Sequence, residues 1–261
     1  MTAINAPSPR PKGYKHPPVT EAVIGINFAN NLSRELLRSA SDKLAKNYPI
    51  HQDLQTVNLD LKLSNLQDQG TVTPRLIEGH RRSSQDMTEL ALTMPTSLLV
   101  SQLAPYPSWE TFSKRFARDW KLVKKAFGFQ EMKRIGLRYI NRIDIPIPGD
   151  SVIKHEEYLN VFPQVPDLLS PLHASAVQTV SYFEDIDCRL VLNWGVVPSP
   201  ILNHCSFILD LDLFRDSKVP QSDKTLFELL DVMRLKKNEV FEACVTQRAR
   251  NEIFNGDRDG K

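Results

Sequence analysis

Apolar and polar positions alternate along a segment near the middle of the chain, residues 134–148. Because successive side chains of a β-strand point to opposite faces, one face would carry an apolar set with one polar member: Leu137, Tyr139, Asn141, Ile143 and Ile145. The opposite face would carry Arg138, Ile140, Arg142 and Asp144. We therefore predict a central strand with one face in the core and one charged, solvated face.

Two features of this segment add detail to the prediction. A buried Asn141 side chain needs hydrogen-bond partners, because leaving it without them costs about 1–3 kcal/mol. Pro146 and Pro148 cannot donate to a strand ladder, so we expect the strand to end there.

Arg138 and Arg142 lie two positions apart on the charged face, with Asp144 beside them. The simplest interpretation is an exposed sheet surface. Guanidinium groups also bind carboxylates and phosphates. These three residues are therefore our candidates for a partner-binding or anion-binding site.

Seven further segments have the composition or alternation of strands: 18–28, 57–63, 71–82, 88–103, 176–184, 188–197 and 205–214. Residues 57–63 alternate most strictly. We expect a kink at Pro95, inside the segment 88–103. Residues 185–187 are expected to form the turn of a hairpin.

Three segments have helical spacing. The first begins after Ser33, a good N-cap, and the best defined covers 108–127, with Ser108 as its cap and Gly128 after its end. Its apolar stripe should pack on a sheet: Trp109, Phe112, Phe116, Trp120, Val123 and Phe127. The last helix begins at Ser222, and we expect a kink or short break at 236–238.

The order of elements repeats along the chain. Residues 18–130 read as strand, helix, three strands and long helix, and residues 131–255 read as strand, shorter helical segment, three strands and long helix. We predict an α+β fold of two similar halves, each an antiparallel sheet backed by its long helix. The same order occurs in TATA-binding-protein-like saddles, although fold does not fix function. Residues 1–17 are expected to form a flexible arm, and residues 256–261 a frayed tail.

Composition narrows the class of protein. The 261 residues carry a net charge of +2, too balanced to indicate nucleic-acid binding from bulk charge alone. The three cysteines, Cys188, Cys205 and Cys244, include no Cys-x-x-Cys, which fits a reduced cytoplasmic setting. No apolar run approaches about 20 residues, so we expect no membrane span. Residues 1–18 also lack the apolar core of a secretory signal.

The helix 108–127 carries a basic side opposite its apolar stripe: Lys114, Arg118, Lys121 and Lys125. A solvated helix face is the simpler interpretation. The alternative is a surface for nucleic acid or for an acidic partner, with Arg81 and Arg82 contributing.

Candidate chemistry is sparse. No dinucleotide, Walker, His-Glu-x-x-His or Gly-x-Ser-x-Gly motif occurs, and we expect no cofactor. Asp210 and Asp212 share a strand face and could bind a divalent ion with Glu184 or Asp187, as in a metal-dependent hydrolase, although a solvated face is favoured.

A zinc site is weakly supported. His204 and Cys205 are adjacent, so their side chains would point to opposite faces of a strand. This weakens a site that includes Cys188 and His173. We assign no metal ligands from the sequence.

Three short motifs carry a resemblance. Residues 17–23 contain Pro-Pro-Val and Glu-Ala-Val, residues 136–143 read Gly-Leu-Arg-Tyr-Ile-Asn-Arg-Ile, and Phe241-Glu242 precedes Thr246 in the last helix. They resemble the signatures of a sporadically distributed bacterial family of about this length, which has no established activity. The resemblance covers almost the whole chain. It implies an accessory setting, such as a defence or toxin–antitoxin module, and offers no catalytic residues.

The sequence leaves three hypotheses in order. The leading one is a non-enzymatic protein that holds a protein partner on a sheet surface or between its halves. The second is nucleic-acid binding through the basic helix face, and the third is a metal-dependent hydrolase. A homo-oligomer remains open.

Overall fold

The computed structural model describes residues 13–60, 71–147, 149, 153–166, 168 and 175–256. The strands are β1 (Val19–Phe28), β2 (Ile50–Asp60), β3 (Thr71–Ser83), β4 (Glu89–Met94), β5 (Ser97–Leu103), β6 (Met132–Pro146), β7 (Ala176–Phe183), β8 (Cys188–Val197) and β9 (His204–Arg215). The main helices are α1 (Arg34–Leu44), α2 (Trp109–Phe127) and α3 (Asp223–Cys244). Short helical turns are η1 (His155–Glu157), η3 (Glu184–Ile186) and η4 (Ala249–Phe254). The predicted α+β class is confirmed.

The strands form one antiparallel sheet in the order β2-β3-β4-β5-β1-β6-β9-β8-β7. The two separate sheets that we predicted are therefore wrong. The physical reason is that β1 and β6, the first strands of the two predicted halves, pair with each other at the centre, with Ile24 opposite Leu137. Each has a buried apolar face on the same side, so pairing extends one core across both.

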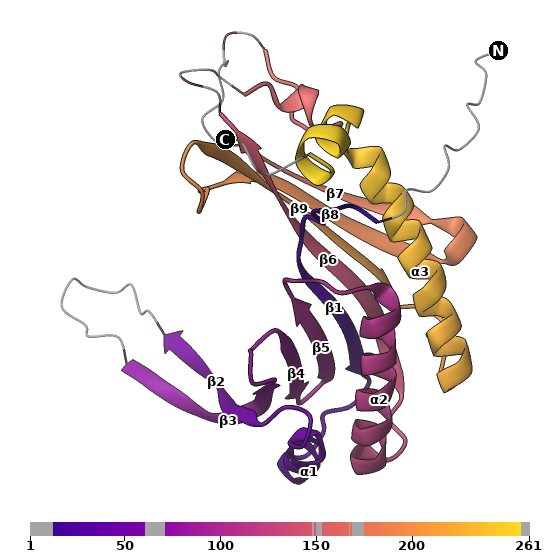
Figure 1. Ribbon diagram of the computed structural model, residues 1–261. Helices are drawn as coiled ribbons and strands as arrows, with labels where there is room; N and C mark the ends of the chain where they lie inside the picture. Colours follow the sequence, from indigo (N-terminus) through magenta and orange to yellow (C-terminus); the bar gives the residue numbers. More distant parts are fainter. Residues whose placement is uncertain are drawn as a thin grey trace.

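The helices α2 and α3 lie side by side on one face of this sheet (Figure 1). Three hydrogen bonds join them in the described part of the chain: Trp109 Nε1 donates to Asp231 at 2.8 Å, and Trp120 Nε1 and Lys124 Nζ donate to Asp223 at 2.9 and 2.7 Å. Because the start of α2 meets the middle of α3 and the later turn meets its first residue, the two helices are antiparallel. No helix of the described part of the chain is long and apolar enough to cross a membrane.

The predicted helix caps and the aromatic stripe are confirmed. Ser33, Ser108 and Ser222 each accept a hydrogen bond from a first-turn backbone N–H. Gly128 ends α2 with φ of +68°, a left-handed conformation that glycine adopts without strain. The stripe of α2 is buried against the sheet and α3, and Phe116 meets the ring of Phe227 edge-on.

The central strand agrees with its alternation. Leu137, Tyr139, Ile143 and Ile145 are buried. The buried Asn141 donates its side-chain N–H to the backbone oxygen of Leu209 at 2.9 Å, which satisfies the requirement stated above. The hairpin of β7 and β8, with η3 at its turn, is also confirmed.

Several boundaries differ from expectation. The segment 88–103 is a hairpin, β4 and β5, in place of one strand kinked at Pro95, because residues 95–96 form a turn that lets both arms pair. Helix α3 runs without a break through 236–238. Lys237 is buried at the helix–sheet interface with its Nζ over the Tyr139 ring, so this turn of the helix packs inward like its neighbours. Strand β2 starts at Ile50, earlier than predicted, and residues 61–63 lie outside the described residues.

The ends of the chain are described only in part. Residues 1–12 of the predicted arm and residues 257–261 of the predicted tail lie outside the described residues. Tyr14, in the last part of the arm, packs on Phe254 and donates a hydrogen bond to Glu242 at 2.6 Å. This part of the arm is therefore attached to α3 and η4.

Candidate functional site

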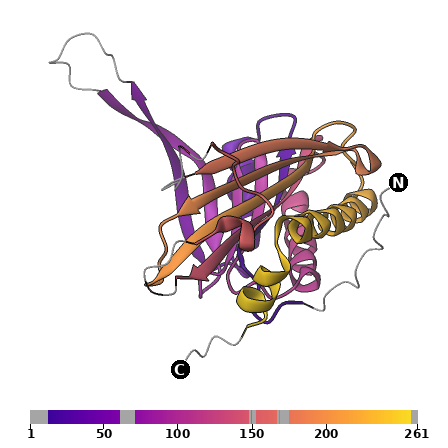
Figure 2. The ribbon, with the colours of Figure 1, turned by 90° about the horizontal axis from the view of Figure 1, so that it is seen from above.

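The face of the sheet opposite α2 and α3 carries no helix among the described residues (Figure 2). We call the outward side chains of β6, β9, β8 and β7 on this side the open face. Those used below are Arg134, Arg138, Arg142, Asp144, Gln178, Val180, Tyr182, Asn193, Asp210 and Asp212.

A row of hydrogen bonds crosses all four strands of the open face. Arg138 donates from Nε and Nη2 to the two oxygens of Asp210, at 2.8 and 2.7 Å. Asn193 donates to Asp210 at 3.1 Å, and Gln178 donates to Asn193 at 2.7 Å. The register places Asp210 opposite Asn193 and Asn193 opposite Gln178. Arg138 lies opposite Asp212 and therefore reaches Asp210 diagonally.

Two further ion pairs flank this row. Arg142 donates to Asp144 at 3.0 Å, and Asp144 accepts a second bond from Ser206 at 2.6 Å. Arg134 donates to Asp212 at 2.8 Å. The predicted partner-binding residues Arg138, Arg142 and Asp144 therefore all lie on the open face, and each arginine already has a carboxylate.

The electrostatics of the open face are locally balanced. The hydrogen bond to Asp210 raises the pKa of Arg138 above its usual value. Burial raises the pKa of Asp212, while the nearby guanidinium groups of Arg134 and Arg138 oppose that rise. Asp210 and Asp212, the candidate metal ligands of the hydrolase hypothesis, thus lie against arginines, and that hypothesis stays a prediction.

The open face ends in an apolar pair on the edge strand β7. Val180 is 66% exposed and Tyr182 is 55% exposed. Both lie on the same side of the sheet as Gln178, by the two-residue period of the strand. Sequence reasoning missed these two residues, although their two-residue spacing on a second, partly apolar side of 176–183 was a readable signal.

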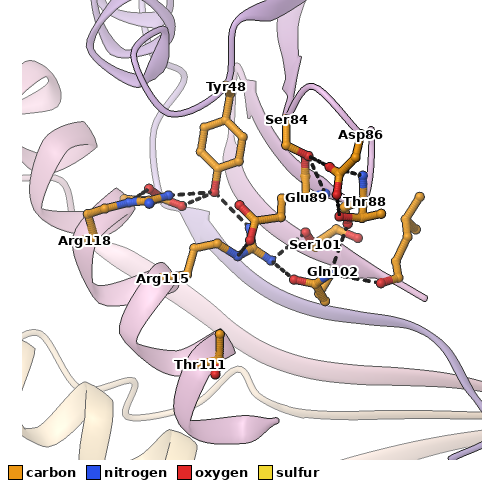
Figure 3. A network of polar contacts seen from close by, with 12 residues as sticks. Tyr48, Ser84, Asp86, Thr88, Glu89, Ser101, Gln102, Thr111, Arg115 and Arg118 are labelled. Atoms are coloured by element: carbon orange, nitrogen blue, oxygen red, sulfur yellow. Dashed lines mark hydrogen bonds and ion pairs between the residues drawn. The ribbon is translucent and has the colours of Figure 1, made fainter. Parts of the chain in front are cut away.

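The basic side of α2 is only partly free. Lys114, Lys121 and Lys125 are exposed. Arg118 donates to the buried Asp119 at 2.8 Å and to the Tyr48 hydroxyl at 3.3 Å (Figure 3). Three lysines therefore remain for the predicted nucleic-acid surface, with Arg118 partly committed.

The two arginines that we added to this surface are also engaged. Arg82 is buried, where it donates to Ser41 at 2.7 Å and pairs with Asp42 at 3.2 Å. Arg81 donates to Gln52 at 3.4 Å. Neither extends the lysine row of α2.

The cysteines are free thiols, and burial raises the pKa of Cys188 and of Cys205. His173 lies outside the described residues. A different group of residues offers ligand atoms at metal-binding distances: His51, Asp53 and His80, whose ligand atoms all lie within 4.8 Å of one another.

The open face combines neutralised arginines with an exposed apolar pair at its edge. Comparison of the chain with protein-family models and with curated proteins gave no match.

Proposed function

We propose that the chain is a non-enzymatic binding protein that holds a protein partner on the open face. The observation that carries this proposal is the exposure of Val180 and Tyr182 at the edge of the sheet. Exposed aromatic and branched side chains beside a polar rim are typical of protein interfaces. The row from Arg138 to Gln178 supplies that rim.

The charges of the open face favour a protein partner over nucleic acid. Nucleic-acid binding is driven by lysine and arginine side chains that neutralise phosphates and so release the counterions of the nucleic acid. Arg134, Arg138 and Arg142 are each paired with an aspartate of the same face. Such pairs offer donors and acceptors of both signs, which complements a mixed polar protein surface.

The edge strand β7 offers a second mode of contact. It has eight residues, and among the described residues the only strand it pairs with is β8, on its inner side. An unpaired strand edge can accept an added strand from a partner through main-chain hydrogen bonds. We propose that a partner which covers Val180 and Tyr182 also pairs with this edge.

We also propose that the two halves of the chain arose by duplication of one ancestral segment. The order of strands supports it, since β5, β4 and β3 follow β1 outward as β9, β8 and β7 follow β6. Helices α2 and α3 then occupy equivalent places. The short turn η1 takes the place of α1 in the second half, and the hairpin strand β2 has no counterpart among the described residues there.

The setting that we propose is accessory, such as a defence or toxin–antitoxin module. Its support is the resemblance of the three motifs described above, especially Gly136 to Ile143. A reduced cytoplasmic location belongs to the same proposal and fits three free thiols.

Nucleic-acid binding is the second candidate. The observation that favours it is that Lys121 and Lys125 are exposed and have no ion-pair partner in the described part of the chain. They lie one turn apart on α2. Salt-dependent retention of DNA that weakens when both become alanine would support this function.

Affinity capture from the producing host tests the leading proposal. We expect the unmodified chain to recover one partner in stoichiometric amount, and the double variant Val180→Lys with Tyr182→Lys to lose it. Lysine at both positions removes the apolar contact and adds charge to a desolvated interface. Both residues are exposed, so folding should be unaffected, which circular dichroism checks.

The matched control is Lys121→Ala with Lys125→Ala, on the exposed side of α2. This control should retain the protein partner. The proposal fails if the control loses the partner while the β7 variant keeps it, or if the unmodified chain is recovered alone.

A further inference from the structure

Three ligand atoms converge beside α1, away from the open face. His51 Nε2 lies 3.2 Å from Asp53 Oδ1, and His80 Nδ1 lies 2.9 Å from the same oxygen. The two histidine nitrogens lie 3.2 Å apart. The three atoms therefore form a nearly equilateral triangle.

Hydrogen bonds alone do not account for this triangle. A neutral imidazole has one protonated and one unprotonated nitrogen, and a carboxylate oxygen only accepts. If one histidine nitrogen donates, the other nitrogen and Asp53 Oδ1 oppose each other with lone pairs. If both donate to Asp53, the two N–H groups oppose each other across 3.2 Å. One close approach is repulsive in every case.

A cation bound by all three atoms removes the conflict, because each atom then directs a lone pair at it. Metal ligands about 2.1 Å from an ion lie about 3.4 Å apart in a tetrahedral site and about 3.0 Å apart where they are at right angles. The observed separations of 2.9 to 3.2 Å match one face of a right-angled, octahedral site, and a tetrahedral ion would widen them by a few tenths of an ångström.

The backbone explains why these residues meet. His51 and Asp53 are two positions apart in β2, so they point to one side of the sheet. Asp53 is opposite His80 in the β2–β3 register. Helix α1 lies over this side and, with the three residues, lines a cavity of about 410 Å³.

We propose that His51, Asp53 and His80 bind one divalent first-row transition-metal ion of the zinc class. Two imidazole nitrogens favour such ions, whereas magnesium and calcium prefer oxygen ligands only. Three protein ligands leave coordination positions open. The partial exposure of His51 and Asp53 leaves an entry path from solvent.

The open positions are complementary to an oxyanion. Arg34 and Arg38 lie one turn apart on α1 and line the same cavity as the three ligands. Neither has an ion-pair partner in the residues that the structure describes. Guanidinium groups bind phosphate and carboxylate oxygens, so we assign the exogenous ligand to this chemical class.

Calorimetric titration of the untagged, chelator-treated full chain with zinc tests the metal site. One equivalent should bind, and Asp53→Asn and His80→Gln should each weaken binding at least about 100-fold. His204→Gln is the matched control, since His204 lies at the start of β9, far along the sheet order from β2 and β3. It should bind zinc as the unmodified chain does.

Cobalt in place of zinc gives a spectroscopic readout of the oxyanion. Inorganic phosphate should change the visible spectrum of the cobalt-loaded protein, and Arg34→Ala with Arg38→Ala should reduce that change without loss of cobalt. Absence of a stoichiometric zinc site, or unchanged zinc affinity in both ligand variants, overturns the metal site. A cobalt spectrum insensitive to phosphate overturns the oxyanion assignment.

Discussion

Asp119→Ala is expected to lower the free energy of unfolding by about 3–5 kcal/mol, because it breaks a buried ionic network. Asp119 in α2 is 0% exposed. Its carboxylate accepts hydrogen bonds from the Tyr48 hydroxyl and from Arg118 Nε. Arg115 Nη1 donates to the same Tyr48 hydroxyl at 2.8 Å (Figure 3).

The size of this effect follows from what the substitution leaves behind. Arg115 is itself buried and would lose one of two nearby negative charges, since Glu89 Oε1, at 3.5 Å from its Nε, would remain. A buried cation that loses part of its compensating charge costs more than a lost neutral hydrogen bond. The network also links α2 to β5, because Arg115 Nη2 donates to the Ser101 backbone oxygen at 2.8 Å.

Urea unfolding at pH 7, followed by circular dichroism, measures this loss. Lys125→Ala on the exposed side of α2 is the control, with an expected change within about 0.5 kcal/mol. A loss below about 1 kcal/mol for Asp119→Ala would show that the network contributes little to stability.

Lys237→Met is expected to raise the free energy of unfolding at pH 7 by about 1–3 kcal/mol. Lys237 in α3 is 8% exposed, and its Nζ lies 3.6 Å from the centroid of the Tyr139 ring. Burial lowers the pKa of this amine to about 7, and the nearby Arg234 adds to that shift. Attraction between the ammonium and the ring offsets part of the desolvation cost.

The pH dependence has a definite sign. The amine of the folded chain has a pKa of about 7, below its value of about 10.4 in the unfolded chain. Between these values the unfolded state binds more protons, so the contribution of Lys237 to stability rises with pH from about 7 to about 10. Methionine removes this contribution and fills a similar volume.

Denaturation at pH 7, 8.5 and 10 measures the free energy of unfolding of the variant and of the unmodified chain. Their difference reports on Lys237, because the other titrating groups contribute equally to both. The advantage of Lys237→Met should shrink as the pH rises. Lys121→Met, on the exposed side of α2, is the control and should show no such trend. An advantage that stays constant from pH 7 to 10 would contradict the buried, shifted amine.

Local patterns were sufficient for most elements of the fold. The alternation of 134–148 predicted the buried face of β6, and serines 33, 108 and 222 marked the true helix starts. These features depend on side-chain periodicity and first-turn hydrogen bonds, both of which are local. The hairpin of β7 and β8 was also predicted from local patterns.

The joining of the halves depends on long-range pairing, which a local pattern does not encode. Nothing in 18–28 or 134–148 alone states that these strands pair with each other at the centre of one sheet. The β4–β5 hairpin was missed for a related reason. Residues 88–103 have strand-like composition on both sides of Pro95, so whether Pro95 kinks one strand or lies in the turn of a hairpin is decided by pairing.

The candidate sites likewise depend partly on local patterns and partly on long-range strand pairing. The alternation placed Arg138, Arg142 and Asp144 on the outer face correctly, but Asp210 reaches Arg138 only through the register of β9. His51 lies in 50–56, which has no clear alternation. The group of His51, Asp53 and His80 depends on the β2–β3 register across 27 positions of sequence.

Hydrogen–deuterium exchange of the chain, alone and with its captured partner, tests the central claim most directly. If a partner occupies the open face, backbone amides of β7, residues 176–183, should exchange more slowly in the complex, because a covered edge strand is protected from water. Amides of α2 should be unchanged. Slower exchange in α2 with β7 unaffected would contradict the account and place the partner on the lysine side of that helix.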